Sequence, residues 1–308
     1  MHIKKRYIIK FVGFFISLVI GFAGFPDQSV LLAAETKLVT DQTGKEVRVP
    51  VSPKRVVALA PSITEIVFAV DRGDLLVGVT RFSNYPEAVK QLPSVGSYVY
   101  LDLERIVSLQ PDLCIAVKDG NPLQIIRRIE SLGIPVYAVD PMEIDAVIHS
   151  IADIGNLLNA ETEASELISD MKQRMDRIDK MISGVSVKPS VFFQIGVSPI
   201  VSAGSETFIH ELIERAGGNN AAGMVSGYPR FSKEEVLSMA PEVMILTSME
   251  RHKVFDAVMR EWRQWENLPA VREDRIHMVN SDLYDRPSPR LVDGLEELAR
   301  LLHPQLFE

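Results

Sequence analysis

Aromatic and charged side chains gather in four segments that could bind a ligand. The segments are predicted loops at residues 80–87, 96–102, 227–231 and 281–290. Together they hold Phe82, Tyr85, Tyr98, Tyr100, Tyr228, Tyr284, Asp282, Asp285 and Arg286. Aromatic faces give large apolar contact at low entropy cost, and a few charged groups fix the orientation of a ligand. This combination favours binding of a bulky amphipathic molecule, although any single tyrosine could instead fold back onto the protein.

Motifs for catalysis and phosphate binding are missing from the sequence. It has no G-x-x-x-x-G-K-[ST] loop, no H-E-x-x-H pair and no G-x-G-x-x-G after a strand. Residues 202–208 contain serines but lack the G-x-S-x-G elbow. The histidines after residue 34 are scattered, which favours surface or packing roles. We therefore predict no catalytic residue, no metal site and no cofactor, and keep an exported α/β enzyme as the alternative from another class.

The elements that must position the loops follow a simple alternation. Short apolar runs alternate with helical patterns, which is typical of βα units around a mostly parallel sheet. Strands are expected at 55–60, 75–80, 112–117, 135–140, 190–196, 199–204, 243–248 and 275–280. Helices are expected at 61–70, 103–110, 123–133, 206–218, 232–239 and 288–303. Because open α/β sheets bind ligands beyond the carboxyl ends of their strands, the aromatic loops are well placed.

A long amphipathic helix is predicted between the two sets of strands. Its apolar positions recur at spacings of three and four, namely Ala164, Leu167, Ile168, Met171, Met175, Ile178 and Met181. A helix of about 24 residues spans on the order of 35 Å, enough to cross two lobes. We predict two Rossmann-like α/β lobes at 35–158 and 185–308, a linker helix at 159–184 and a ligand cleft between the lobes. One stiff connector predicts lobes that move little.

One short pattern occurs twice in the chain. Residues 101–115 and 231–245 align at a constant offset of 130 residues, so that Glu104 matches Glu234. Each copy predicts a short helix followed by a proline, an acidic residue and a strand. Duplicated lobes would place the two copies at equivalent positions on either side of the cleft.

Both predicted helices have their own capping residues. Asp102 and Ser232 stand at the N-cap positions, and Glu235 stands where a capping box would need it. The caps therefore do not require Glu104 or Glu234, which could simply favour the helix dipole.

The first 34 residues are typical of a secretory signal peptide. Lys4, Lys5 and Arg6 precede the apolar run 11–25, and small residues stand before Glu35. An uncleaved membrane anchor is the alternative. We expect export to the periplasm, without a lipid anchor on an N-terminal cysteine, because no cysteine directly follows the apolar run.

Charge and cysteine content exclude further classes. The net charge is −8, and it becomes −11 without residues 1–34, which carry four Lys or Arg and one Asp. Such an acidic chain is a poor candidate for nucleic-acid binding. Cys114 is the single cysteine, so a disulfide or a cysteine-based zinc site cannot form within one chain.

Five segments resemble a known family in the same order along the chain. They are RVVALAPSITEIVFAV, VGVTRFSNYP, LDLERIVSLQPDLCIAV, SLGIPVYAVD and SDLYDRPSPR. The chain resembles bacterial periplasmic substrate-binding proteins with two α/β lobes joined by one long helix, which serve ABC importers of vitamin B12, siderophores and haem. The similarity is strongest to the members that bind vitamin B12, in SNYP, in DLERIVSLQPDL and in the Asp-x-x-x-Arg-x-Ser-Pro-Arg ending.

The resemblance implies a set of ligand contacts. It places around a corrinoid the residues Phe82, Tyr98, Tyr228, Asp282, Tyr284 and Arg286. Asp282 and Arg286 could alternatively pair with each other. The chain departs from the vitamin B12 pattern at Val117 and Val201, where the relatives have large aromatics. A ferric siderophore or haem is therefore the alternative ligand, and haem would need an axial Tyr or His from a cleft loop.

The resemblance also implies a function and a partner. It implies a non-enzymatic, monomeric receptor that hands a cobalamin-like molecule to an inner-membrane permease dimer with its ATPase subunits. In the resembled family, glutamates at the positions of Glu104 and Glu234 dock into arginine pockets of the two permease subunits.

Overall fold

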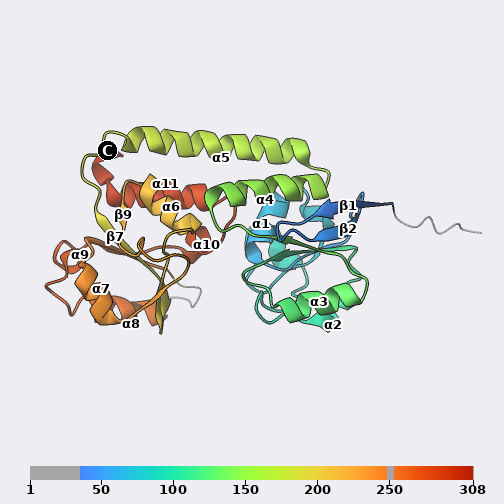
Figure 1. Cartoon of the computed structure of the whole chain (residues 1–308), viewed down its shortest axis with the longest axis horizontal. Helices are drawn as coiled ribbons and strands as arrows, with labels where there is room; N and C mark the ends of the chain where they lie inside the picture. The colour runs from blue at the N-terminus through green and yellow to red at the C-terminus, as the bar shows by residue number, and fades with distance from the viewer. Residues whose placement is uncertain (1–34, 248–252, 308) are drawn as a thin grey trace, which may run out of the picture. The chain divides into compact units, whose positions relative to one another are not determined.

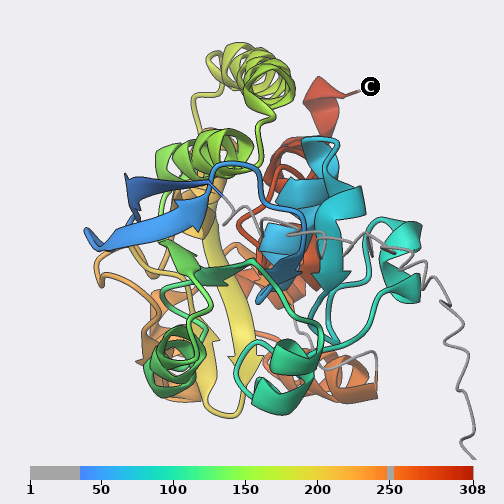
Figure 2. The same cartoon turned by 90° about the vertical axis from the view of Figure 1, so that its right-hand side faces the viewer.

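The computed structural model describes residues 35–247 and 253–307, and the predicted signal peptide lies outside them. The described part begins with an antiparallel hairpin of β1 (Thr36–Thr40) and β2 (Glu46–Pro50), which the sequence analysis did not predict. Gln42 in its turn attaches the hairpin to the neighbouring sheet. The Gln42 N–H donates to the Ala138 carbonyl (3.0 Å), and the Asp140 N–H donates to Gln42 Oε1 (2.7 Å). Figure 2 shows this hairpin in blue.

A four-stranded parallel sheet and its helices form the first lobe. The strand order is β4-β3-β5-β6. The strands are β3 (Val56–Ala58), β4 (Leu76–Gly78), β5 (Leu113–Val117) and β6 (Val136–Val139). The helices are α1 (Pro61–Ala69), α2 (Leu103–Ser108), α3 (Leu123–Ser131) and α4 (Ile144–Leu157), with 3₁₀ turns η1 (Gly73–Leu75) and η2 (Glu87–Gln91). The strands are apolar runs because both faces of a parallel sheet are covered.

A six-stranded mixed sheet and its helices form the second lobe. The order is β10-β8-β7-β11-β12, with β9 beside β7. The strands are β7 (Ser190–Val197), β8 (Ile200–Ser202), β9 (Asn219–Asn220), β10 (Arg230–Phe231), β11 (Val243–Leu246) and β12 (Ile276–Met278). The helices are α6 (Phe208–Arg215), α7 (Lys233–Met239), α8 (Lys253–Trp262), α9 (Pro269–Arg272), α10 (Ser281–Tyr284), α11 (Leu291–Leu302) and η3 (Pro304–Leu306). Strand β8 runs antiparallel to β7 because a two-residue turn joins them.

One long helix, α5 (Glu161–Ile182), connects the lobes, as predicted. It packs on α4 of the first lobe and on α11 of the second (Figure 1). Most of the predicted stripe is buried or half-buried, but Met181 is 37% exposed and Ile182 is buried in its place. Arg174 also joins α5 to α11, because its guanidinium donates to Asp293 (2.6 Å) and Glu296 (3.0 Å).

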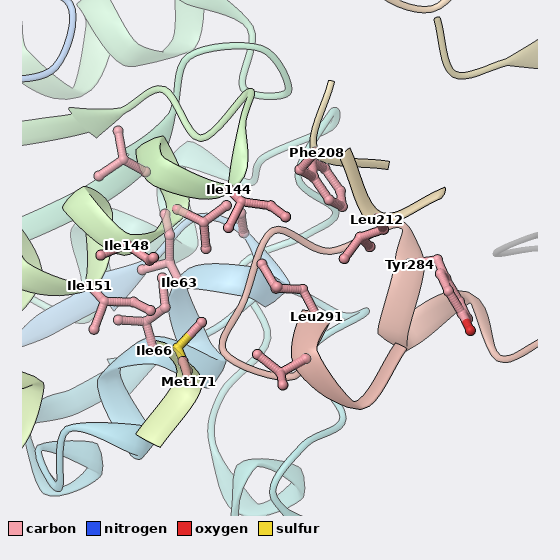
Figure 3. Close-up of a cluster of buried hydrophobic side chains, with 14 of the residues drawn as sticks. Ile63, Ile66, Ile144, Ile148, Ile151, Met171, Phe208, Leu212, Tyr284 and Leu291 are labelled. Atoms are coloured by element: carbon pink, nitrogen blue, oxygen red, sulfur yellow. The ribbon is translucent and has the colours of Figure 1, made fainter. Parts of the chain in front are cut away.

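One hydrophobic cluster spans both lobes, and each lobe has a further cluster of its own. Figure 3 shows a single cluster that contains side chains from α1, α4, α5, α6 and α11, among them Ile63, Ile148, Met171, Leu212 and Leu291. Two hydrogen bonds with backbone N–H donors also cross the same boundary. The Phe208 N–H donates to the Met142 carbonyl (2.6 Å), and the Ile144 N–H donates to Glu211 Oε2 (2.9 Å). The lobes are therefore joined by packed side chains as well as by α5.

The repeated pattern forms α2 and α7, and both predicted caps are present. Asp102 accepts a hydrogen bond from the Arg105 N–H (3.1 Å). Ser232 and Glu235 form the capping box, in which the Ser232 N–H donates to Glu235 (2.6 Å) and the Glu235 N–H donates to Ser232 (3.2 Å). The N-caps of both helices are therefore complete without the side chains of Glu104 and Glu234.

The acidic residue after each repeated proline also has a structural role. Asp112 accepts from the N–H groups of Lys54 (2.7 Å) and Arg55 (3.0 Å), just before β3. Glu242 accepts from the N–H of Ser190 (2.8 Å), the first residue of β7. In both lobes this carboxylate therefore satisfies backbone donors at the start of a neighbouring strand.

Candidate ligand-binding site

A cavity of about 710 Å³ lies between the lobes and is lined by residues of both. The first lobe contributes the segments that follow β3, β5 and β6 together with Tyr98. The second lobe contributes the end of β7, part of β8, the start of α6, and Tyr228 and Asp285. This volume is within the usual range for small-molecule sites. Its position beyond the carboxyl ends of parallel strands is where open α/β sheets bind ligands.

Tyr98 and Tyr228 face the cavity from opposite lobes, where the sequence analysis placed them. The Tyr98 loop is held by Asn121, whose Nδ2 donates to the carbonyls of Tyr98 and Leu59 (both 2.8 Å). Burial, followed by the nearby Asp285 carboxylate, raises the pKa of Tyr98 and raises the pKa of Tyr228 to about 12. Both hydroxyls therefore remain protonated donors at neutral pH.

Three further residues singled out by the sequence lie on or behind this wall. Val117 and Val201, the two departures from the vitamin B12 pattern, both line the cavity. Phe82 does not line it. Its ring packs edge-on against Tyr98, with 6.2 Å between the ring centroids. Phe82 therefore contacts Tyr98 and not the cavity, which corrects its predicted role as a direct contact.

The prediction that Tyr284 contacts the ligand is wrong. Tyr284 is fully buried in the core, and its ring centroid lies 5.5 Å from that of Phe193. Its hydroxyl is 2.9 Å from both the Gly294 carbonyl and Glu297 Oε2. The side chain faces α11 and β7 because α10 turns it away from the cavity.

Arg286 is the centre of a buried polar network. Its Nη1 donates to Glu65 Oε1 (2.8 Å) and to Asn84 Oδ1 (2.8 Å), and its Nη2 donates to the Phe82 carbonyl (2.9 Å). Asp282 Oδ1 lies 2.6 Å from Nη2. The side chains of Arg286 and Glu65 are only 6% and 2% exposed. Asp282 and Arg286 thus pair with each other, which was the alternative to a direct contact with the ligand.

The same network connects motifs that are far apart in the sequence. Asn84 of SNYP donates to Asp282 Oδ2 (2.8 Å), and Ser288 donates to Glu65 Oε2 (2.7 Å). Arg290 lies 3.4 Å from Glu65 and stacks on the Tyr85 ring at 4.2 Å. Asp282 is not among the residues that line the cavity, whereas Arg286 is.

The charged part of the cavity wall is mainly acidic. It consists of Asp119, Asp140, Asp285 and Arg286. Asp140 is paired with Lys118 at 2.5 Å. Within the described residues, six buried side-chain polar atoms lack a hydrogen-bond partner, and three belong to this wall: Asp140 Oδ1, Asp285 Oδ2 and Arg286 Nε. Each of these three atoms is enclosed by the protein and has no surface open to the cavity.

Asp119 and Asp140 line the cavity but were not predicted as site residues. Both directly follow parallel strands, β5 and β6, so their position at strand ends was the signal that could have found them. In residues 35–247 and 253–307, no group of three His, Cys, Asp or Glu side chains could hold a metal ion. No helix within those ranges is long and apolar enough to cross a membrane.

The family follows from a comparison with known proteins. Residues 56–283 match the family model described as periplasmic binding protein. The chain belongs to this family. The vitamin B12-binding protein of Vibrio parahaemolyticus is 31% identical over 247 residues, which cover 80% of this chain and 88% of the relative. An ABC transporter substrate-binding lipoprotein of Bacillus subtilis, YvrC, is 31% identical over 276 residues, 88% of this chain and 86% of the relative.

Solved structures of the family share the fold. The periplasmic vitamin B12-binding protein BtuF of Vibrio cholerae aligns with a TM-score of 0.74 at 27% identity, covering 84% of this chain and all of that chain. The periplasmic haem-binding protein RhuT of Roseiflexus sp. RS-1 aligns with a TM-score of 0.73 at 26% identity, covering 82% and 99%. These findings confirm the predicted two-lobed α/β fold and a substrate-binding protein of the vitamin B12, haem and siderophore class.

We predict that Arg286→Ala destabilises the fold. The change leaves the buried Glu65 carboxylate without its main partner, and breaking a buried pair in this way costs about 3 kcal/mol or more. Arg105→Ala is the matched control, because its ion pair with Asp102 (3.7 Å) is exposed and should contribute less than about 1 kcal/mol. Denaturant unfolding measures both. Equal, small losses of unfolding free energy would show that the network does not stabilise the lobes.

Proposed function

We propose that this family member is a non-enzymatic receptor that captures cobalamin or a related corrinoid in the cavity. It delivers the ligand to an inner-membrane ABC permease dimer with its ATPase subunits. The protein acts as a monomer in the periplasm after export by its N-terminal signal peptide. The observation that carries the choice of ligand is the cavity wall, which offers two tyrosines, apolar surface and carboxyl groups.

The charges on this wall favour an amide-rich ligand over an anionic one. Among the described lining residues, Arg286 is the one cation, and both its terminal nitrogens are already used by the buried network. Asp119 and Asp285 add two carboxyl groups to the wall and no positive charge. The carboxylates of haem would meet no available cation there, and like charges at close range repel. Peripheral amides of a corrinoid carry no charge and can both donate and accept hydrogen bonds.

The alternative of haem also lacks a suitable axial ligand on the wall. No histidine lines the cavity in the described part of the chain. A tyrosine that ligates haem iron does so best as a phenolate. The raised pKa of Tyr98 and Tyr228 disfavours that form.

Calorimetry of the purified protein tests the ligand. We expect binding of cyanocobalamin in preference to haem or ferric siderophores. Tyr98→Ala and Tyr228→Ala should each weaken binding by about 2 kcal/mol, because each removes an aromatic face from the wall. Tyr100→Ala is the matched control, since Tyr100 is 80% exposed and does not line the cavity.

Analysis of the ligand after incubation with the protein separates a receptor from an enzyme. Recovery of chemically unchanged ligand supports a receptor, and conversion of the ligand would support an enzyme. No heat with any corrinoid, together with clear binding of haem or a ferric siderophore, would contradict the cobalamin proposal.

Glu104 and Glu234 are the proposed docking contacts for the permease. They occupy equivalent positions in the first turns of α2 and α7, one in each lobe, and both are exposed. Neither forms an ion pair with another described residue. Because the caps of both helices are complete without them, their charge is available to a partner, where charge complementarity fixes register.

We predict that Glu104→Arg and Glu234→Arg impair uptake through the cognate importer, and that the double change impairs it most. Folding and ligand affinity should remain nearly unchanged, because both side chains are exposed and remote from the cavity lining. Glu166→Arg on α5 is the control, since Glu166 is also exposed and lies on the helix that Figure 1 shows along the opposite edge from α2 and α7. Normal uptake by the double variant would leave both glutamates with a purely local role in their helices.

A further inference from the structure

The turn that follows β5 places an exposed carboxylate at the cavity wall. Asp119 lines the cavity, and its side chain is open to solvent. Within residues 35–247 and 253–307, no hydrogen bond or ion pair involves this side chain, whereas the neighbouring Lys118 is paired with Asp140 at 2.5 Å. The first lobe therefore gives the cavity a carboxylate whose two oxygens no other described residue engages.

Asn121 fixes the position of this turn. Its Oδ1 accepts a hydrogen bond from the Val117 N–H (2.8 Å), and its own N–H donates to the Val117 carbonyl (3.2 Å). Its Nδ2 donates to the carbonyls of Leu59 and Tyr98 (both 2.8 Å), which ties the turn to the end of β3 and to the Tyr98 loop. Asn121 is buried, so these bonds are shielded from water. Asp119 is thus held in place before a ligand arrives, and a preorganised group loses little entropy on binding.

Tyr228 brings the complementary group from the second lobe. It lines the same cavity, and burial, followed by the charges of Asp285 and Asp119, raises the pKa of Tyr228 to about 12. Its hydroxyl is therefore a hydrogen-bond donor, whereas the Asp119 carboxylate can only accept. A primary amide suits such a wall, because it is uncharged and offers both an acceptor and a donor. A carboxylate on the ligand has no donor for Asp119 and is repelled by it.

We propose that Asp119 determines ligand specificity by accepting a hydrogen bond from an amide N–H of the bound molecule. For the corrinoid of the proposed function, on which this inference rests, the donor is one of the primary amides at the edge of the ring. A ligand with a carboxylate at that point loses the hydrogen bond and meets a like charge. Asp119 therefore favours the amide and excludes the corresponding acid, which separates two molecules of almost the same shape.

Singly hydrolysed cyanocobalamins test this proposal, because each has one peripheral amide converted to a carboxylate and otherwise keeps the shape of the ligand. Calorimetry compares cyanocobalamin with each of these monocarboxylic acids for wild type and Asp119→Asn. Wild type should bind at least one of the acids about a hundredfold more weakly than cyanocobalamin, since a charged hydrogen bond is lost and a repulsion is added. Asp119→Asn should reduce that difference to about threefold, because an asparagine amide can accept from an amide and donate to a carboxylate.

Two further variants keep the interpretation specific. Asp119→Ala should bind cyanocobalamin about tenfold more weakly than wild type, because the acceptor is removed. Asp170→Asn on α5 is the matched control, since Asp170 is also exposed and does not line the cavity, and it should leave the affinities for amide and acid unchanged. Denaturant unfolding should give the same stability for all these proteins, because the Asp119 side chain makes no hydrogen bond within the described part of the chain.

The possible failures are distinguishable. If wild type binds every monocarboxylic acid as tightly as cyanocobalamin, the inference is overturned and the corrinoid receptor stands. If wild type and Asp119→Asn discriminate between amide and acid to the same extent, other groups are responsible and the inference is again overturned. If wild type binds no corrinoid and binds haem or a ferric siderophore tightly, the inference and the proposed function fail together.

Discussion

The ion pair between Arg286 and Glu65 is the constraint on which the ligand site depends. Two buried charges must be paired and hydrogen-bonded, so Glu65 on α1 requires the segment after α10 to lie against the first lobe. Asn84 and Asp282 complete the network from either side. This interaction joins sequence positions more than 200 residues apart and brings the loop that carries Asp285 to the cavity wall.

The same constraint explains why three consecutive residues have three different roles. Tyr284 enters the core, Asp285 lines the cavity and Arg286 forms the network. A four-residue helix has no apolar period from which these directions could be predicted, and Tyr284 was therefore wrongly predicted to contact the ligand. In contrast, α5 was predictable because its apolar positions recur at helical spacing along the whole helix. The parallel strands were predictable because each is a short, continuous run of apolar residues. Tyr98 and Tyr228 were predicted at the site because loops that follow parallel strands converge there. Phe82 lies in such a loop as well, but its ring packs on Tyr98 and does not line the cavity, so the position of a loop does not decide which of its rings reaches the ligand.

The repeated pattern divides into a structural part and a part available for recognition. The caps and the acidic residues Asp112 and Glu242 satisfy backbone groups within each lobe. Glu104 and Glu234 have no comparable task, and their exposure on two equivalent helices gives the molecule a matched pair of negative points. Such a pair is useful to a partner only if the distance between the lobes is constant. The shared core, the hydrogen bonds from Phe208 and Ile144, and α5 all act against movement between them.

The central claim is therefore that the two lobes hold a preformed cavity in a fixed geometry. Small-angle X-ray scattering of the purified protein, with and without saturating cyanocobalamin, tests this most directly. We expect nearly the same radius of gyration in both states, because closing the lobes would require the common core and the Arg286 network to break. A clear contraction on ligand binding would contradict the account and would show that the cavity forms only when the lobes close.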